Sequence, residues 1–345
     1  MNNSTCCPST DSPRCGIDFR TGRVIVVTVY SSVFLLGLIT NLLTLWPIIQ
    51  QVRQQKNVLG IYLLTLVTSD LLYILTLPLW VLYVFGGNVW TLGNKACALV
   101  AFVFYSNMYI SVCLLCCISL DRYLAVVYPI RSLAFRSRRA AGATCTVVTI
   151  IVFAFHLGVT VGSGAQDGVS CYDTYPLQGS VAKFNYFRFV AGFLLPLVVL
   201  ATSYLKIFQG VKQSSSLSKE RKAKVKHLSI GVIVIFLLCF APYHLLLLLR
   251  TAVFSSYADP DASCVFERKV HVYFSLALAM SSLNSALDPI LYILVSDSVK
   301  EDLKRAFRCQ TNLCQCAQAP TVTPGIKRAA EEKMHSPDNI ATVLE

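Results

Sequence analysis

Residues 113–129 read CLLCCISLDRYLAVVYP, a long apolar run that ends at an adjacent acid and base, Asp121 and Arg122. An unpaired charge is costly in an apolar interior, so a charged pair at the end of such a run marks an end that meets a different environment. Apolar runs separated by short charged segments recur along most of the chain. This alternation decides the fold.

The composition is that of a membrane protein, because 55% of the 345 residues are hydrophobic and only 14% are charged. An apolar run of about 20 residues is long enough to cross a bilayer as a helix. The sequence therefore predicts an all-α fold, a bundle of seven transmembrane helices. The expected spans are 24–49, 58–84, 97–127, 140–162, 184–210, 228–250 and 270–295.

The basic residues predict the orientation of the bundle. Three connections, 50–57, 128–139 and 211–227, together hold twelve Lys or Arg and one acid, whereas the three alternate connections hold one Lys and no Arg. Connections rich in Lys and Arg face the cytoplasm, so we expect a multi-pass plasma-membrane protein with an extracellular N-terminus. The net charge of +12 is explained by this placement, and no nucleic-acid partner is expected.

Four segments are expected along the chain. The stretch after the last span places Val299, Leu303 and Phe307 on one helical face beside basic residues, which is typical of a short helix lying on the inner leaflet. The residues after it are rich in Pro, Thr and charge. The organisation is an extracellular segment 1–23, a helix bundle 24–295, an amphipathic eighth helix 296–309 and a disordered cytoplasmic tail 310–345.

The outer cysteines are candidates for disulfides. Cys97 lies at the outer end of the third span and Cys171 in the second outer loop, so both face an oxidising compartment and can pair. Cys264 is also outside. Its partner is one of the three N-terminal cysteines Cys6, Cys7 and Cys15, and the sequence does not select among them.

Two kinds of covalent modification are expected outside the bundle. Asn2 and Asn3 each open an N-x-[ST] sequon, so we expect glycosylation of the N-terminal segment. Cysteines that closely follow the last span are candidates for palmitoylation: Cys309, Cys314 and Cys316.

Two carboxylates lie inside apolar spans. Asp70 lies near the middle of the second span and Asp288 in the seventh, where a charge costs about 2.5 to 3.5 kcal/mol, so both are expected to face the bundle interior. Asn107 and Ser111 are four apart on span three, and Asn284 is four from Asp288, so each pair shares a helical face. The cluster suits a sodium ion, a proton sensor or a structural hydrogen-bond network.

A second cluster is expected in the outer half of the bundle. Arg188, His244 and Arg250 lie in the outer halves of spans five and six, with aromatic residues at the same level: Tyr83, Tyr105, Tyr109 and Phe240. A basic rim over an aromatic cavity suits a lipid that carries a carboxylate or a phosphate. The alternative is that the arginines pair with outer acids such as Asp173 or Glu267.

Proline residues inside the spans predict kinks, because proline removes one helical hydrogen bond. Pro78, Pro196, Pro242 and Pro289 lie in spans two, five, six and seven. Each is expected to bend its helix.

Taken together, these features resemble the class A (rhodopsin-like) G-protein-coupled receptors. The resemblance rests on seven spans, an outer N-terminus, a Cys97–Cys171 pairing, DRY at 121–123, CFAPYH at 239–244 and NSALDPILY at 284–292. It implies that Asp121 holds Arg122 at rest beside Tyr123, and that Arg122 moves toward Tyr204 and Tyr292 on activation. It also implies a heterotrimeric G-protein as partner, followed by arrestin and receptor kinases.

Within that family the chain resembles the subgroup that senses protons and responds to lysolipids, and most of all its member that responds to oxidised fatty acids. Asp288 contributes to this resemblance, and so do longer stretches: 76–93, 116–129, 171–179, 185–196, 222–227, 239–250 and 264–270. The subgroup has a buried acid triad on spans two, four and seven. His156 replaces the span-four acid, so the resemblance places His156 with Asp70 and Asp288.

Other function classes are disfavoured. The sequence shows no internal repeat of the kind that builds transporters, no lysine in the seventh span for a retinal Schiff base, and no enzyme motif, so no catalytic residue, metal or cofactor is expected beyond a sodium ion. Partners are an extracellular lipid or proton and the surrounding membrane lipids. The alternative functions are a class A receptor for another small ligand, such as a nucleotide or peptide, and, more remotely, a transporter.

Overall fold

The structure is a computed structural model. It describes the main chain of residues 13–54, 58–132, 136–162, 170–172, 175, 177–213, 218–256 and 260–295.

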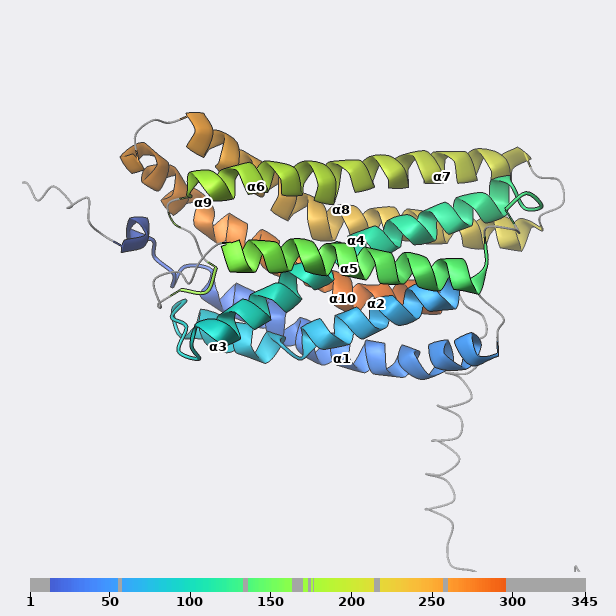
Figure 1. Cartoon of the computed structure of the whole chain (residues 1–345), viewed down its shortest axis with the longest axis horizontal. Helices are drawn as coiled ribbons and strands as arrows, with labels where there is room; N and C mark the ends of the chain where they lie inside the picture. The colour runs from blue at the N-terminus through green and yellow to red at the C-terminus, as the bar shows by residue number, and fades with distance from the viewer. Residues whose placement is uncertain are drawn as a thin grey trace, which may run out of the picture. The chain divides into compact units, whose positions relative to one another are not determined.

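In these ranges the chain forms helices that lie side by side and supply seven segments long and apolar enough to cross a membrane (Figure 1). All seven predicted spans are confirmed. Spans one, three, four and six are single helices, and the other three are interrupted. The helices are α1 (Arg23–Arg53), α2 (Leu59–Ile74), α3 (Leu77–Phe85), α4 (Asn94–Val127), α5 (Arg138–Gly162), α6 (Gly179–Phe189), α7 (Leu195–Gln213), α8 (Lys219–Ser256), α9 (Pro260–Ser281) and α10 (Leu283–Val295).

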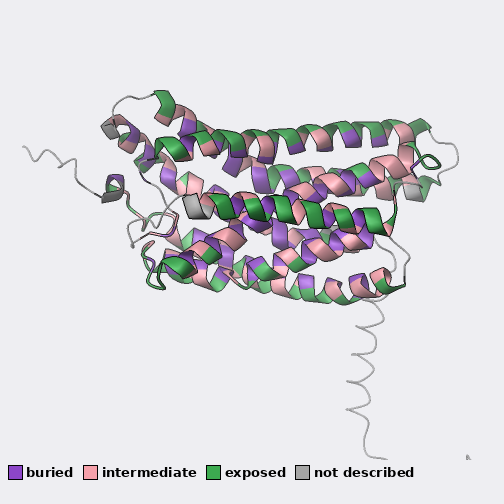
Figure 2. Cartoon of the chain, in the orientation of Figure 1, coloured by how far each residue is buried: buried purple, intermediate pink, exposed green. Residues whose placement is uncertain are grey.

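The outward faces of the helices are apolar, and the polar side chains turn inward. On α1, Leu35 and Trp46 are about 60% exposed, at 59% and 63%, while Asn41 on the same helix is fully buried. Figure 2 shows exposed residues along the outer faces of α1, α5 and α7. This inside-out pattern fits a bundle whose solvent is lipid, because lipid does not penalise exposed leucine but does penalise an unsatisfied polar group.

Two helices are longer than the sequence predicted. We expected span six to begin at 228, but α8 begins at Lys219, inside the basic connection. We expected span seven to begin at 270, but α9 begins at Pro260. Hydropathy marks only the part of a helix that lies in lipid. Stretches such as KERKAKVK contain good helix formers that continue the helix into water.

Span seven breaks earlier than its proline predicted. The helix is interrupted at Ser282, whose hydroxyl accepts a hydrogen bond from Tyr73 at 2.6 Å, while Pro289 lies inside α10. Pro289 has no N–H to donate to the carbonyl of Ser285, and Asn41 Nδ2 donates to that carbonyl at 2.8 Å. Asn41 therefore replaces the hydrogen bond that proline removes, and α10 stays helical through Pro289.

Several predictions lie outside the described residues. They are the glycosylation of Asn2 and Asn3, the palmitoylation of Cys309, Cys314 and Cys316, the eighth helix 296–309, the tail 310–345 and the placement of the Tyr292 side chain.

Candidate functional site

The outer half of the bundle is built around one buried arginine. Arg188, on α6, is only 7% exposed. Its Nε donates to the hydroxyl of Tyr109 on α4 at 3.0 Å, and its Nη2 donates to the hydroxyl of Tyr243 on α8 at 2.6 Å. The guanidinium carbon also lies 4.5 Å from the centre of the Tyr105 ring and 5.5 Å from that of Phe184. We call these five residues the Arg188 cluster.

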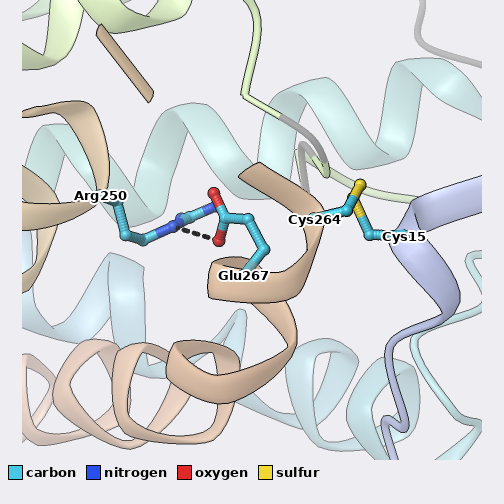
Figure 3. Close-up of a disulfide and its surroundings, with 4 residues drawn as sticks. All are labelled: Cys15, Arg250, Cys264 and Glu267. Carbon is cyan, nitrogen blue, oxygen red and sulfur yellow. Dashed lines mark hydrogen bonds and ion pairs between the residues drawn. A yellow bond between two sulfur atoms is a disulfide. The ribbon is translucent and has the colours of Figure 1, made fainter. Parts of the chain in front are cut away.

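The two arginines of the predicted basic rim differ in their partners, and Figure 3 shows those of Arg250. Arg250 makes a two-bond fork with Glu267, at 2.8 Å and 3.0 Å, and both side chains are buried. Arg188 has no carboxylate within salt-bridge distance among the described residues. Arg250 therefore follows the alternative of an internal ion pair with Glu267, whereas the described neighbours of Arg188 are hydroxyls and rings. Asp173, the other acid of that alternative, lies outside the described residues.

A buried unpaired cation is unfavourable, since moving a charge out of water costs several kcal/mol. Hydroxyl groups and aromatic faces offset part of this cost. An anionic group placed beside Arg188 would supply the missing charge. The cluster therefore offers a buried positive charge among aromatic rings, which suits an anionic group.

The cluster extends through Tyr109 to His244. The His244 Nδ1 lies 2.8 Å from the carbonyl oxygen of Phe240, which can only accept, so Nδ1 donates. In the neutral ring Nε2 then accepts from the hydroxyl of Tyr109, 3.3 Å away. In the order Arg188, Tyr109, His244, Phe240, each group donates a hydrogen bond to the next, and these bonds fix the orientation of the Tyr109 ring.

Close packing on span five also positions Tyr109. Between α6 and α7 the chain makes a π-helical turn, Val190–Leu194, and such turns often re-aim side chains at functional sites. Gly192 lies in this turn, and a Cβ atom at that position would overlap the ring of Tyr109. The missing side chain of Gly192 therefore leaves the space that Tyr109 occupies.

The structure corrects the placement of His156. The resemblance placed it with Asp70 and Asp288, but its ring stacks on Tyr105 at 6.2 Å and on Tyr109 at 5.2 Å. Asn107, which bonds Asp70, is two residues from each tyrosine, so it projects about 200° away around α4. His156 therefore belongs beside the Arg188 cluster. The physical reason is that the cluster a side chain joins is decided by its angular position around the helix axis, and not by its depth along the span.

The disulfides lie at the outer end of the bundle. Cys97 pairs with Cys171, and Cys264 pairs with Cys15, which settles the choice that the sequence left open (Figure 3). The second bond ties the N-terminal segment to α9. Glu267, the partner of Arg250, lies three residues after Cys264, so the disulfide and the ion pair fasten the same end of α9.

His271 contacts the tied N-terminal segment. Its Nε2 is 3.4 Å from the carbonyl oxygen of Asp18, and its ring lies 5.0 Å from that of Phe19. The backbone N–H of Arg20 and the hydroxyl of Thr21 donate to the Asp18 carboxylate and hold its pKa below the ordinary value. Asp18 therefore stays ionised throughout the range from pH 8 to pH 6.

The predicted carboxylate pocket is present in the middle of the bundle. Asp70 accepts from Asn107 Nδ2 at 2.9 Å, and Asn284 Nδ2 donates to Asp288 at 2.8 Å. Ser285, which the sequence analysis missed, donates to Asn107 at 3.2 Å and links the two halves.

Oxygen atoms in this pocket fit a small cation. Within the part of the chain that the structure describes, four buried oxygens of this pocket have no hydrogen-bond partner: Asp70 Oδ2, Asp288 Oδ1, Asn284 Oδ1 and Ser111 Oγ. Carboxylate, amide and hydroxyl oxygens are the ligands that hard cations prefer. The donor set therefore suits sodium, and the two nearby carboxylates also provide a place for a proton.

A small cavity adjoins the carboxylate pocket. Its volume is about 10 Å³, and it is lined by Asn107 and Asn284 and by aromatic residues that include Phe240, Phe104 and Tyr73. Phe240 thus lines the inner cavity, and its ring is fully buried.

At the inner end, Asp121 holds two arginines. Arg122 Nη2 lies 2.6 Å from Asp121 Oδ2, as the resemblance implies for the resting state. Arg136, from the connection between α4 and α5, donates to both oxygens of Asp121, at 2.8 Å and 3.2 Å. Tyr123 packs against Tyr128. The hydroxyl of Tyr204 is buried and has no hydrogen-bond partner among the described residues.

Sequence reasoning missed several residues of these sites. Asn41 had a signal, because it is an amide inside an apolar run. Tyr243 gave no signal separate from that of its neighbour His244. Its position around α8 is what brings its hydroxyl to Arg188. Arg136 looked like one more basic residue of an inner loop, and no pattern separates it from Arg139.

Comparisons with known proteins agree with this architecture. The sequence profile of the family described as 7 transmembrane receptor (rhodopsin family) matches residues 40–292. The human probable G-protein coupled receptor 132 is 42% identical over 293 residues, which are 85% of this chain and 76% of that protein. Human G-protein coupled receptor 68 is 38% identical over 311 residues, 88% of this chain and 82% of that protein.

A third relative, the human uracil nucleotide/cysteinyl leukotriene receptor, is 31% identical over 293 residues, 84% of this chain and 78% of that protein. The family match covers most of the chain, and each of these relatives aligns over more than two thirds of it. The resemblance drawn from the sequence motifs is confirmed, as a relationship between sequences. The chain belongs to the rhodopsin family of seven-transmembrane receptors, and it is therefore a multi-pass G-protein-coupled receptor and not an enzyme.

Proposed function

We propose that the chain is a plasma-membrane receptor with an extracellular N-terminus that binds an acidic lipid, such as a lysophospholipid or an oxidised fatty acid, and activates heterotrimeric G-proteins. The observation that carries the proposal is Arg188, a buried guanidinium with no carboxylate partner among the described residues. A carboxylate or phosphate head group would pair with it through short charge-assisted hydrogen bonds.

The surroundings of Arg188 support a ligand with a long apolar part. Tyr105, Phe184 and Tyr243 present ring faces to the guanidinium, and fully buried aromatic side chains continue inward to Phe240. An acidic head group at Arg188 with a chain along these rings would bury apolar area, which is the main source of affinity for such a ligand. Arg250 has no such role in this proposal, because Glu267 already neutralises it.

The carboxylate pocket is proposed to hold a sodium ion in the resting receptor. Asp70 and Asp288 each keep one oxygen to which no described residue donates a hydrogen bond. A cation there offsets the repulsion between the two carboxylates, and protonation of one of them does the same. We therefore propose that this pocket, and not His156, is the place where a proton signal would act.

A nucleotide is the second candidate ligand. One relative is named as a receptor for uracil nucleotides and cysteinyl leukotrienes, and both ligands carry acidic groups. A nucleotide would use Arg188 in the same way. The aromatic lining favours the lipid, because a nucleotide brings several charges and little apolar surface.

The test is second-messenger output in cells, with readouts for each class of G-protein and wild type and variants at equal surface expression. The ligands are a lysophospholipid, an oxidised fatty acid and a uracil nucleotide, each applied from pH 8 to pH 6. We expect a lipid response that Arg188→Gln removes and Arg139→Ala keeps. A pH response that Asp288→Asn flattens places the proton site in the carboxylate pocket. A lipid response that survives Arg188→Gln contradicts the proposal, and a response to the nucleotide alone favours the second candidate.

A further inference from the structure

We propose that Arg136 is a positioning residue for the activation switch: it holds Asp121 when Arg122 departs, and in this way makes the departure of Arg122 easier. The starting observation is that one carboxylate serves two arginines. Arg136 spans both oxygens, with Nε 2.8 Å from Oδ1 and Nη2 3.2 Å from Oδ2. Arg122 uses only Oδ2, through Nε at 3.1 Å and Nη2 at 2.6 Å.

Geometry favours Arg136 as the permanent partner. A fork that engages both oxygens of a carboxylate is the most specific arrangement of an arginine and an acid. Oδ1 receives a hydrogen bond from Arg136 and none from Arg122. Removal of Arg122 therefore leaves the Arg136 fork intact, with one bond on each oxygen.

The burial of Asp121 makes this second partner important. The Asp121 side chain is 5% exposed, whereas Arg122 and Arg136 are 25% and 20% exposed. A buried carboxylate that loses its only counter-ion is strongly destabilised. With Arg136 in place, the carboxylate is never left alone, so the release of Arg122 does not require a proton on Asp121.

Arg136 is held independently of Arg122. Its backbone N–H donates to the carbonyl of Ser132 at 2.9 Å, and the Ser132 hydroxyl donates to the carbonyl of Leu124 on α4 at 3.2 Å. The connection between α4 and α5 is thereby attached to the helix that carries Asp121. When Arg122 turns away, these contacts do not have to change.

Tyr204 is a candidate partner for Arg122 after it leaves Asp121. Among the described residues, the buried Tyr204 hydroxyl on α7 has no hydrogen-bond partner. A guanidinium that reaches this hydroxyl would satisfy it. The structure thus contains both an acceptor for the departing arginine and a substitute for it at Asp121.

If Arg136 serves only to fasten the connection between α4 and α5, the expected change in ligand-independent activity has the opposite sign. If Arg136 only fastened the resting loop, its removal would loosen the inner end and raise ligand-independent activity. If Arg136 substitutes for Arg122, its removal leaves Arg122 as the one partner of Asp121 among the described residues and lowers that activity. The sign of the change therefore separates the two roles, and overall stability alone would not.

The experiment uses the purified full-length receptor in lipid nanodiscs without added ligand. We measure the affinity of nucleotide-free heterotrimeric G-proteins, one from each class, for the wild type, Arg136→Ala, Asp121→Asn and the double variant. We expect Arg136→Ala to weaken binding about tenfold, which corresponds to about 1.4 kcal/mol. In the Asp121→Asn background the same substitution should change affinity less than about twofold, since no carboxylate is left to hold.

Two further variants keep the result interpretable. Arg139→Ala removes an exposed charge from the same segment and should leave the affinity unchanged. Arg136→Lys keeps the charge without the fork and should fall between wild type and Arg136→Ala, and it replaces Arg136→Ala if the latter does not fold.

The remaining outcomes overturn the inference. They are tighter G-protein binding by Arg136→Ala, or an equal loss in both Asp121 backgrounds, which would mean that Arg136 contacts the G-protein itself. The inference rests on the G-protein coupling of the chain. If the wild type binds no heterotrimer while remaining folded, the coupling fails and the inference fails with it, whereas wild-type binding with an unaffected Arg136→Ala variant overturns the inference alone.

Discussion

The most informative perturbation is a comparison of Arg188→Gln with Arg250→Gln. Both substitutions remove a buried guanidinium from the outer half of the bundle, where the two side chains are 7% and 5% exposed. The two variants differ in the groups that remain around the substituted side chain. Arg250→Gln leaves the Glu267 carboxylate buried without its partner, whereas Arg188→Gln leaves only hydroxyls and rings.

The structure sets the magnitudes. Loss of one partner from a buried ion pair costs about 3 to 5 kcal/mol, so Arg250→Gln should lower the stability of the ligand-free receptor by that amount. Arg188→Gln loses two hydrogen bonds from a charged donor, each worth about 1.5 to 3 kcal/mol, but it also removes an unpaired charge whose burial costs several kcal/mol. These contributions nearly cancel, and ligand-free stability should change little.

Ligand affinity should show the reverse order. A charge pair between Arg188 and an acidic head group is worth about 3 kcal/mol within the 2 to 5 kcal/mol range for buried pairs, so Arg188→Gln should weaken binding about 150-fold. Arg250→Gln, measured below its unfolding temperature, should bind within about threefold of wild type, because a factor of three is under 1 kcal/mol.

The assay is thermal unfolding of purified receptor, with and without the lipid that activates it in cells, together with a direct binding isotherm. Glu267→Gln added to Arg250→Gln is the matched control and should restore much of the lost stability, since no carboxylate is then left unpaired. The reasoning is refuted if Arg188→Gln destabilises the ligand-free receptor as much as Arg250→Gln does, or if both variants lose affinity equally.

Three further predictions concern single positions. Gly192→Ala adds a methyl group that overlaps the Tyr109 ring, so lipid potency in the cell assay should fall at least about tenfold, a loss of about 1.4 kcal/mol; unchanged potency would mean that Tyr109 does not position the ligand. Asn41→Leu removes the donor to the Ser285 carbonyl, leaves that acceptor unsatisfied and should cost about 1 to 3 kcal/mol of stability by thermal unfolding; an unchanged unfolding temperature would contradict this role. Replacement of potassium by sodium should raise the unfolding temperature of the wild type but not of Asp70→Asn, and an equal response of both would exclude the pocket as the sodium site.

The spans were predictable because lipid selects for apolar surface over a fixed length. The same rule does not report where a helix ends in water, which is why the starts of α8 and α9 were placed nine and ten residues too late. The break at Ser282 was not predictable from Pro289. The break falls where Tyr73 of span two donates to the Ser282 hydroxyl, whereas Asn41 of span one satisfies the carbonyl that Pro289 leaves without a donor.

The carboxylate pocket was predictable from helical spacing, because partners four residues apart must share a face. Which of the two arginines, Arg188 or Arg250, pairs with an acid was not predictable from the sequence. Whether Arg250 or Arg188 finds an acid depends on how α9 is fastened at its outer end, and that depends on Cys15 and Cys264. His156 was misplaced for a related reason: a sequence gives the level of a residue along a span but not the rotation of one helix against another.

The central claim is that Arg188 recognises a negative charge, and the most direct measurement compares an acidic lipid with its uncharged ester. Thermal stabilisation of the purified wild type by an oxidised fatty acid and by its methyl ester should differ, with the acid stabilising strongly and the ester weakly. In Arg188→Gln the two lipids should stabilise equally weakly. Equal stabilisation of the wild type by acid and ester would contradict the account, because the buried guanidinium would then contribute nothing to recognition.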